Sequence, residues 1–501
     1  MFSLTFEQFE TLSQKGNLIP LYREIPADLD TPVSAFLKIQ SGKNDFLLES
    51  VVGGEKWGRY SFLGSDPSAI FRSRGDEVEI IRGHKKSKMP VDDDPLQTLR
   101  NFLAAYIPAS LEGVGSEPLS RFFGGAVGFL SYDMVRHFEK IPKTAKDELG
   151  LYDSYLMITD TVVIFDNLRQ VMQVVANLHV ETDKPLKQIY EEGVHKIERL
   201  VQKLKGATPV QHLKRVETGK VHQLTQELTA LHTEEEFCSL VERAKEYIKA
   251  GDIFQVQIST RFEEKTEIPP LALYRAIRRI NPSPYLYFLQ YEDMALVGAS
   301  PEVMVRLEEK KVELRPIAGT RRRGKNTEED LALEIELKND PKERAEHIML
   351  VDLGRNDLGR VCEAGSVTVD EQEVVERYSR VMHLVSHVSG KVKPGVDAFQ
   401  VLRSTFPAGT LTGAPKIRAM EIIEELEGKR RGVYGGAVGY ISFSGNMDMA
   451  ITIRTALFYK GKIYIQAAAG IVYDSVPRLE YKECQNKARA LLDALTTVNN
   501  L

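Results

Sequence analysis

The sequence predicts an α+β fold in which large antiparallel β-sheets pack face to face as a sandwich, with helices on the outside. Short apolar runs separated by Gly, Pro and Asp turns fill about the first 200 residues, and 46–51, 62–65, 68–73 and 77–82 are typical of strands. Longer amphipathic patterns, at 186–206 and again from residue 233, are typical of helices that cover one face of a sheet.

The second of these helices has a clear start and leads into a strand. Thr233 and Glu236 have the spacing of a capping box, and Gly251 ends the apolar periodicity. The next segment, 253–260, predicts a strand. Its alternation sets two groups on opposite faces, namely Phe254, Val256 and Ile258 on one, and Gln255, Gln257 and Ser259 on the other.

Composition limits the classes of function. The 501 residues are 43% hydrophobic and carry a formal net charge of -5 with no sustained basic segment, which argues against nucleic acid as the main ligand. No apolar run is long enough to span a membrane, and acidic residues stand near the amino terminus where a signal peptide needs an apolar core. Cys238, Cys362 and Cys484 lie far apart without metal-ligand spacing, so a reducing cytoplasm is the expected location.

Length and patterning predict two regions, 1–203 and 229–501, joined by a polar linker at 204–228. Two pairs of segments repeat in the same order across the regions. FGGAVGFLSYD from Phe123 resembles YGGAVGYISFS from Tyr434, and FLGSDPSAIFR from Phe62 resembles LVGASPEVMVRL from Leu296. The repetition indicates two structurally related halves.

A candidate acidic site begins in the segment after Asp340, which predicts a helix start with Pro and Glu in its first turn. Glu346 lies on the margin of the apolar stripe of this helix, where a carboxylate is unusual. A boundary glutamate paired with Arg344 or His347 is the alternative interpretation. Further along the chain, the basic run 429–431 follows a helical segment, and we interpret it as a solvated cationic helix end.

The last helix supplies a second candidate carboxylate. Residues 463–469 predict a strand, Gly470 allows a close approach, and Glu480, Glu483 and Lys487 share one face of the helix that follows. A solvated stripe of salt bridges is the alternative. One glutamate from each helix, with water and substrate oxygens, suits Mg²⁺, and this pattern indicates chemistry on small anionic molecules.

An ordered set of motifs makes the interpretation specific. They are SPE (300–302), PIAGT (316–320), EHIMLVDLGRND (346–357), FPAGTLTGAPK (406–416), GVYGGAVGY (432–440), MDMAITIRT (447–455) and AGIVYDSVPRLEYKECQNKA (469–488). Together they resemble the chorismate-utilising enzymes through most of 230–495. LLES (47–50) and NPSPY (281–285) extend the resemblance to the large subunits of anthranilate synthases.

The resemblance implies a site for magnesium and chorismate. Glu346 and Glu483 would hold the metal that clamps the ring carboxylate, and Lys487 would add positive charge. Arg454 and Tyr434 would bind the enolpyruvyl carboxylate, since a guanidinium suits a planar anion. The implied lining of the substrate site is Gly319, Thr320 and Thr410, together with the backbone of Ala468, Ala469 and Gly470. The family usually has Gly-Ala-Gly at the last three positions, so Ala468 adds a methyl group there.

The resemblance also implies catalytic roles. Glu302 would be the general acid that protonates the departing 4-hydroxyl, which leaves poorly unless protonated. His383 would assist the later elimination of pyruvate, which makes the ring aromatic, and Lys487 completes the catalytic set.

Two positions separate this chain from sister activities of the family. Isochorismate and salicylate synthases carry a lysine base where this chain has Gln255, and a glutamine amide takes no proton near neutral pH. Aminodeoxychorismate synthases carry a nucleophilic lysine where this chain has Ala318. The remaining reaction is direct attack of ammonia on ring carbon 2.

Partners and regulation are implied as well. No cysteine lies in a glutaminase-like elbow, so ammonia would come from a glutamine amidotransferase subunit, in a heterotetramer of two large and two small subunits. Ser50, Pro284, Tyr285 and Leu286 match the inhibitor-site motifs for tryptophan, which makes 1–203 regulatory and 229–501 catalytic. Aminodeoxychorismate synthase and a catalytically inactive tryptophan sensor are the rival interpretations.

Overall fold

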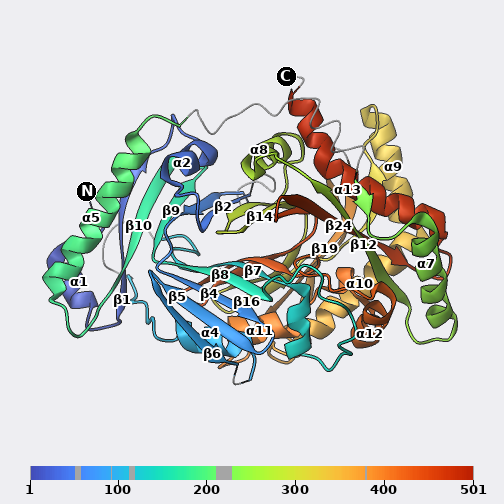
Figure 1. The fold of residues 1–501 in the computed structure, drawn as a ribbon, viewed down its shortest axis with the longest axis horizontal. Helices are drawn as coiled ribbons and strands as arrows, with labels where there is room; N and C mark the ends of the chain where they lie inside the picture. The colour runs from blue at the N-terminus through green and yellow to red at the C-terminus, as the bar shows by residue number, and fades with distance from the viewer. Residues whose placement is uncertain are drawn as a thin grey trace.

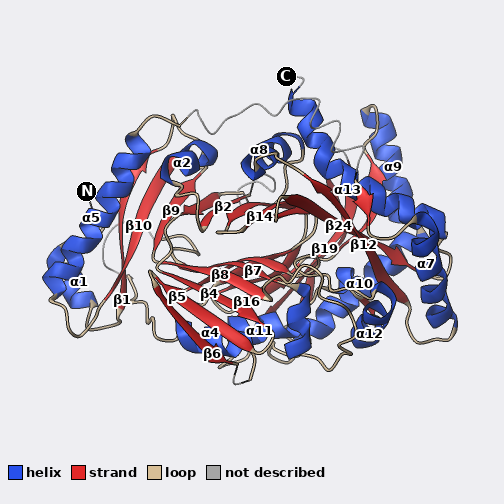
Figure 2. Ribbon diagram, viewed as in Figure 1, coloured by secondary structure: helices blue, strands red, loops and turns tan. Residues whose placement is uncertain are grey.

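Two large sheets packed face to face form the centre of the molecule. The computed structural model describes residues 2–50, 58–91, 93–111, 119–209, 228–378 and 381–499. Within them the strands form two sheets of 12 strands each, and helices lie outside the sandwich (Figures 1 and 2). The predicted α+β sandwich is therefore confirmed.

The strand orders show how the chain fills both layers. The first sheet runs β1 (Leu18–Pro26), β10 (Val171–His179), β9 (Thr161–Asp166), β3 (Tyr60–Gly64), β2 (Asp45–Glu49), β13 (Tyr285–Gln290), β14 (Met294–Ser300), β23 (Thr455–Tyr459), β24 (Lys462–Ile471), β12 (Gln255–Lys265) and β11 (Thr229–Ala230), with β20 (Gly413–Ala414) beside β12. The second sheet runs β17 (Ile317–Arg322), β19 (Val381–Lys391), β16 (Lys311–Leu314), β15 (Val303–Glu308), β22 (Met447–Ile451), β21 (Ala437–Ser442), β7 (Gly125–Leu130), β8 (Ser154–Thr159), β4 (Ala69–Arg74), β5 (Glu77–Arg82) and β6 (Lys85–Pro90), with β18 (Thr368–Arg377) beside β19.

Helices cover the outer faces of both sheets. Those sharing a core with the first sheet are α1 (Phe6–Leu12), α2 (Pro32–Ile39), α5 (Leu186–Lys205), α7 (Glu234–Lys249), α8 (Pro270–Ile280), α12 (Lys416–Glu427) and α13 (Pro477–Asn499). Those packed with the second sheet are α4 (Pro95–Leu103), α9 (Thr327–Asn339), α10 (Pro341–Gly359) and α11 (Ala398–Thr405), and the 3₁₀ segments are η1 (Tyr132–His137) and η3 (Gly409–Leu411). In the described part of the chain, no helix has the length and apolar character needed to cross a membrane.

Local sequence signals explain why helices form where they do. In α5, Ile189, Gly193, Ile197 and Val201 recur every four residues and are all buried. A Cβ atom at Gly193 would lie 2.2 Å from a methyl carbon of Leu178, so glycine allows α5 to lie close against β10. The start of α7 also follows the prediction.

The capping box predicted before α7 is present. The Thr233 side chain accepts from the backbone N–H of Glu236, and the Glu236 side chain accepts from that of Thr233. The strand that follows differs from its prediction, because β12 begins at Gln255 and Phe254 is 73% exposed rather than facing the core. Phe254 precedes the ladder, so the alternation that buries Val256 and Ile258 does not apply to it.

The two repeated segments occupy equivalent places in the sandwich. The GGAVG segments form β7 and β21, which pair with each other at the middle of the second sheet, with Gly128 opposite Gly439. The other pair forms β3–β4 and β14–β15, and each of these connections crosses from the first sheet to the second. The chain therefore folds as two related halves.

Both sheets continue across the predicted regional boundary, since β2 pairs with β13 and β7 pairs with β21. The predicted linker, 204–228, lies mostly outside the described residues. The division into regulatory and catalytic regions stays a prediction.

Candidate active site

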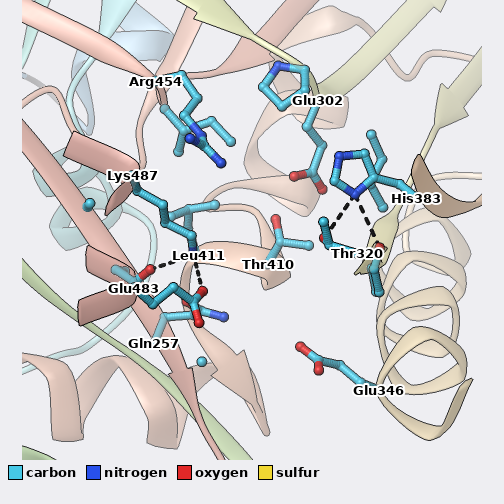
Figure 3. A pocket seen from close by; sticks show the side chains of 18 of the residues that line it. Gln257, Glu302, Thr320, Glu346, His383, Thr410, Leu411, Arg454, Glu483 and Lys487 are labelled. Carbon is cyan, nitrogen blue, oxygen red and sulfur yellow. Dashed lines mark hydrogen bonds and ion pairs between the residues drawn. The ribbon is translucent and has the colours of Figure 1, made fainter. Parts of the chain in front are cut away.

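A cavity of about 610 Å³ is lined by the ends of strands from both sheets and by helices α10 and α13 (Figure 3). It collects nearly all side chains predicted for the substrate, the metal and the chemistry. These are Glu302, Gly319, Thr320, Glu346, His383, Thr410, Tyr434, Arg454, Ala468, Gly470, Glu483 and Lys487. Ala469 does not line the cavity: its side chain faces the helix-side core because neighbouring residues of β24 alternate between faces. Only its backbone can serve a ligand.

Glu302 is a buried acid just before β15. Its side chain is 7% exposed, and burial raises its pKa to about 8. The Thr410 hydroxyl and the backbone N–H of Ile317 oppose this rise without cancelling it. The carboxyl is therefore protonated at neutral pH and available as a proton donor.

His383 on β19 has a defined orientation. Its Nδ1 lies 3.1 Å from the carbonyl oxygen of Gly319 and 3.0 Å from the Thr320 hydroxyl. Because a carbonyl oxygen only accepts, Nδ1 carries the hydrogen and Nε2 has a lone pair. Burial lowers the pKa of the imidazole, which keeps the ring neutral, and Figure 3 shows His383 beside Glu302 at the same cavity.

Arg454 has a strained backbone and a guanidinium without a partner among the described residues. Its φ of 51° lies in the left-handed region, which is costly for a residue with a side chain. Its guanidinium forms no hydrogen bond or ion pair with the residues that the structure describes, and burial lowers its pKa. Tyr434 lines the same cavity. A partly exposed guanidinium that lines the cavity and has no partner among the described residues is a binding position for an anionic group.

Carboxylates face the cavity from two helices. Glu346 on α10 accepts from the Gln255 amide at 2.7 Å, and its pKa is raised by burial, with Glu343 and Glu483 adding to the rise. On α13, Glu483 lies 2.6 Å from Nζ of Lys487. Glu480 also has a raised pKa, caused by burial and by Glu483. A cation placed between the helices relieves this accumulation of negative charge.

The donor set is compatible with Mg²⁺. Among the described residues, no three His, Cys, Asp or Glu side chains come together as a complete metal site. Mg²⁺ uses few protein carboxylates and keeps positions for water and substrate, so two glutamates facing one cavity suffice. The alternative pairing of Glu346 is not observed, because Arg344 pairs with Glu373 and His347 bonds to Ser386.

Small residues of β24 form one wall. A Cβ atom at Gly470 would lie 2.7 Å from Nε2 of Gln255 and 2.9 Å from Nε2 of Gln257, so glycine lets the two amides lie close to the strand. Ala468 lines the cavity, and its carbonyl oxygen accepts from Lys487 at 2.8 Å. The extra methyl group of Ala468 is therefore a direct part of the cavity wall.

Gln257, Lys342 and Gln466 also line the cavity, and the sequence predicted no role for them. A signal existed for Gln257, because alternation placed it on the same face as Gln255. The sequence holds no comparable signal for Lys342 or Gln466, whose place at the cavity depends on how α10 and β24 pack in the fold.

The four residues predicted for the inhibitor site line a second, smaller cavity of about 50 Å³ between the sheets. Ser50 directly follows β2, and Leu286 lies on the neighbouring strand β13, beside Pro284 and Tyr285. The Tyr285 hydroxyl donates to Asp448 at 2.8 Å. The residues are brought together as expected, and their role in binding stays a prediction.

Known proteins resemble the chain over nearly its whole length. Anthranilate synthase component 1 of Aquifex aeolicus (strain VF5) is 47% identical over 496 residues, which is 98% of each chain, and that of Acetivibrio thermocellus is 44% identical over 99% of each chain. The crystal structure of anthranilate synthase component I from Streptococcus pneumoniae TIGR4 matches with a TM-score of 0.76 and 34% identity over 93% of this chain and 99% of that one.

The menaquinone-specific isochorismate synthase of Escherichia coli shares the fold, with a TM-score of 0.69 and 19% identity over 98% of each chain. The sequence model of the chorismate binding enzymes matches residues 45–493, which includes every residue of the site described above. The chain belongs to the chorismate binding enzyme family.

Proposed function

We propose that this chain is the large subunit of an anthranilate synthase, which converts chorismate and ammonia into anthranilate and pyruvate with Mg²⁺. This reaction is the first step of tryptophan biosynthesis. The observation that carries the proposal is a cavity with a protonated acid, Glu302, and with Arg454, whose guanidinium has no partner among the described residues. Gln255, which bonds to the cavity residue Glu346, and the cavity-lining Ala318 stand where sister enzymes hold lysines.

The residues at positions 255 and 318 favour ammonia over other nucleophiles. The Gln255 amide is committed to Glu346 and takes no proton, so it cannot activate water. Ala318 lines the cavity with a methyl group, which cannot attack the ring. These two positions argue against isochorismate synthase and against aminodeoxychorismate synthase.

Each remaining residue has a role in the proposed reaction. Arg454, with Tyr434, holds the enolpyruvyl carboxylate. As ammonia adds to ring carbon 2, Glu302 gives its proton to the 4-hydroxyl, which leaves as water. Nε2 of His383 then accepts the proton from carbon 2 while the bond between the ring and the enolpyruvyl oxygen breaks. The released enolate takes a proton and becomes pyruvate, and the ring becomes aromatic.

Glu346 and Glu483 are the residues that would hold Mg²⁺. When bound, the metal supplies positive charge for the ring carboxylate of chorismate. Lys487 pairs with Glu483 and donates to the carbonyl oxygen of Ala468 on β24. These two contacts hold the Glu483 carboxylate close to β24.

The cysteines support an external source of ammonia. Burial raises the pKa of Cys362 to about 11 and that of Cys484 to about 12, and it also raises the pKa of Cys238. Glutamine hydrolysis needs a thiolate, so none of the three is suited to it. A glutamine amidotransferase subunit would supply ammonia, in a cytoplasmic heterotetramer of two large and two small subunits.

Chorismate, Mg²⁺ and an ammonium salt are expected to give fluorescent anthranilate and an equal amount of pyruvate. Glutamine in place of ammonium is expected to give nothing until a glutaminase is added. A non-aromatic aminated product would identify aminodeoxychorismate synthase instead. Tryptophan binding without any turnover would identify an inactive sensor.

Ser50→Phe is expected to abolish inhibition by L-tryptophan while turnover with ammonium persists. The small cavity lined by Ser50, Pro284, Tyr285 and Leu286 has no room for both a phenyl ring and an aromatic ligand. Initial rates measured against tryptophan concentration test this, with Ser50→Thr as the control that retains inhibition. Inhibition of Ser50→Phe equal to that of the parent would show that tryptophan binds elsewhere.

A further inference from the structure

A buried ion pair, Glu427–Arg431, lies behind the active-site cavity. The sequence predicted a solvated cationic end for 429–431, and this is wrong for Arg431, whose side chain is 1% exposed. Lys429 and Arg430 do lie near the surface, with side chains about one third exposed, beside Glu148 and Asp147. Arg431 turns inward because acceptors and aromatic rings deep in the fold surround its guanidinium, among them the ring of Tyr132, whose centroid lies 4.7 Å away.

Arg431 contacts several cavity-lining elements at once. Its Nη1 donates to the carbonyl oxygen of Leu411 at 2.6 Å, and its Nη2 donates to that of Gln257 at 2.8 Å. Its Nε and Nη2 donate to Glu427 at 2.9 and 2.7 Å. The guanidinium also lies 5.9 Å from the ring centroid of Tyr434. Leu411, Gln257 and Tyr434 all line the cavity.

Glu427 extends the network to two strands of the first sheet. One of its oxygens accepts from the backbone N–H and from the hydroxyl of Ser259, each at 2.8 Å. The Ser259 hydroxyl in turn accepts from the amide of Gln466 at 2.8 Å, and Gln466 on β24 lines the cavity. One ion pair thus joins β12, β24, η3 and the loop that carries Tyr434.

We infer that Arg431, held by Glu427, is a positioning residue that fixes Thr410 and Leu411 of η3 against Glu302 and the substrate. The inference rests on the proposed function. A buried ion pair contributes little net stability relative to apolar packing. The several hydrogen bonds that this pair makes are therefore better explained by a role in fixing geometry than by a role in stability. The planar guanidinium has several N–H donors at fixed angles, so it can bond to two carbonyls and a carboxylate at once. A lysine ammonium lacks this geometry.

A displacement of η3 is expected to change the pH dependence of kcat. The Thr410 hydroxyl lowers the pKa of Glu302, as does the N–H of Ile317, while Tyr378 and His383 are the titratable neighbours that face the same carboxyl. If η3 moves, the nearby Thr410 hydroxyl opposes the effect of burial less, so the pKa of Glu302 rises further. Since Glu302 acts when protonated, the fall of kcat at high pH then moves to higher pH.

Arg431→Lys is the test, assayed with chorismate, Mg²⁺ and ammonium. We expect kcat to fall about 10-fold because the reacting groups are misplaced, the high-pH fall to shift upward, and the KM for chorismate to change little. Arg136→Lys is the matched control. Arg136 pairs with Glu424, one turn before Glu427 on α12, with side chains 7% and 5% exposed, and neither residue lines the cavity.

The outcomes separate the two proposals. If the parent protein does not aminate chorismate, the proposed function fails. If the parent is active and folded Arg431→Lys keeps its kcat and pH profile, or if Arg136→Lys changes them equally, the inference is overturned. If Arg431→Lys does not fold, Glu427→Gln carries the test, because glutamine still accepts from Ser259 but no longer holds the guanidinium by charge. It is expected to reproduce the shifted profile, and an unshifted one overturns the inference.

Discussion

Glu302→Gln is expected to lower kcat about 10³-fold with ammonium as the nitrogen source. General acid catalysis contributes about 10²- to 10⁴-fold, and the 4-hydroxyl is a poor leaving group without a proton. Glutamine has nearly the same shape and occupies the same space near Thr410 and Ile317, so binding of chorismate is expected to persist. Glu302→Gln is therefore expected to lower kcat and to leave the KM for chorismate nearly unchanged.

The pH dependence of the parent gives an independent measure of Glu302. Burial raises the pKa of its carboxyl to about 8, so the acid form is present at neutral pH and is lost as the pH rises above this value. A plot of kcat against pH should fall on the alkaline side near pH 8, and Glu302→Gln should lack that fall. Glu308→Gln, at the exposed far end of β15, the strand that begins directly after Glu302, is the control and should keep the parental profile. Full activity in Glu302→Gln would remove the general acid from the mechanism.

Glu346→Gln is expected to reduce Mg²⁺-dependent turnover about 10²-fold or more. The amide keeps the size of the side chain but loses the negative charge that a hard cation needs. Even supporting residues around a metal affect affinity by about 10- to 100-fold, so a direct ligand should have at least that effect. Glu483→Gln is expected to behave alike, because the two carboxylates face one cavity from α10 and α13.

Metal binding measured by calorimetry, without substrate turnover, separates this effect from a defect in chemistry. Glu343→Gln is the matched control: it lies one turn earlier on α10 and lines the same cavity, but its carboxylate is held by Arg321 at 2.9 Å. It should retain most of the metal affinity. Equal affinity in Glu346→Gln, Glu483→Gln and the parent would place the metal elsewhere.

Much of the local structure could be predicted because its causes are local. The cap at Thr233, the helix start at Asp340 and the four-residue spacing along α5 depend on neighbours within one or two turns. The carboxylate positions of Glu346 and Glu483 on their helix faces followed from the same periodicity. The functional assignment came from the ordered motifs, which no single local pattern supplies.

The contacts and the exposure of those residues depend on the tertiary structure. Glu346 bonds to Gln255, Ala469 faces away from the cavity, and Phe254 is exposed beyond the end of β12, and each result depends on strand pairing and on where a ladder ends. The clearest case is Arg431, which by sequence is one of three adjacent cations. Its burial arises because β12, η3 and α12 converge around it, and residues so far apart in the chain leave no periodic signal.

The sequence by itself determined the strands, the helices and the set of chemical groups available to the site. Only the tertiary structure decided which groups share a cavity and which of them are neutral or unpaired there. The physical reason is that propensity and periodicity act over a few residues, whereas burial, the pKa of Glu302 and the charge of Arg454 depend on contacts between distant segments.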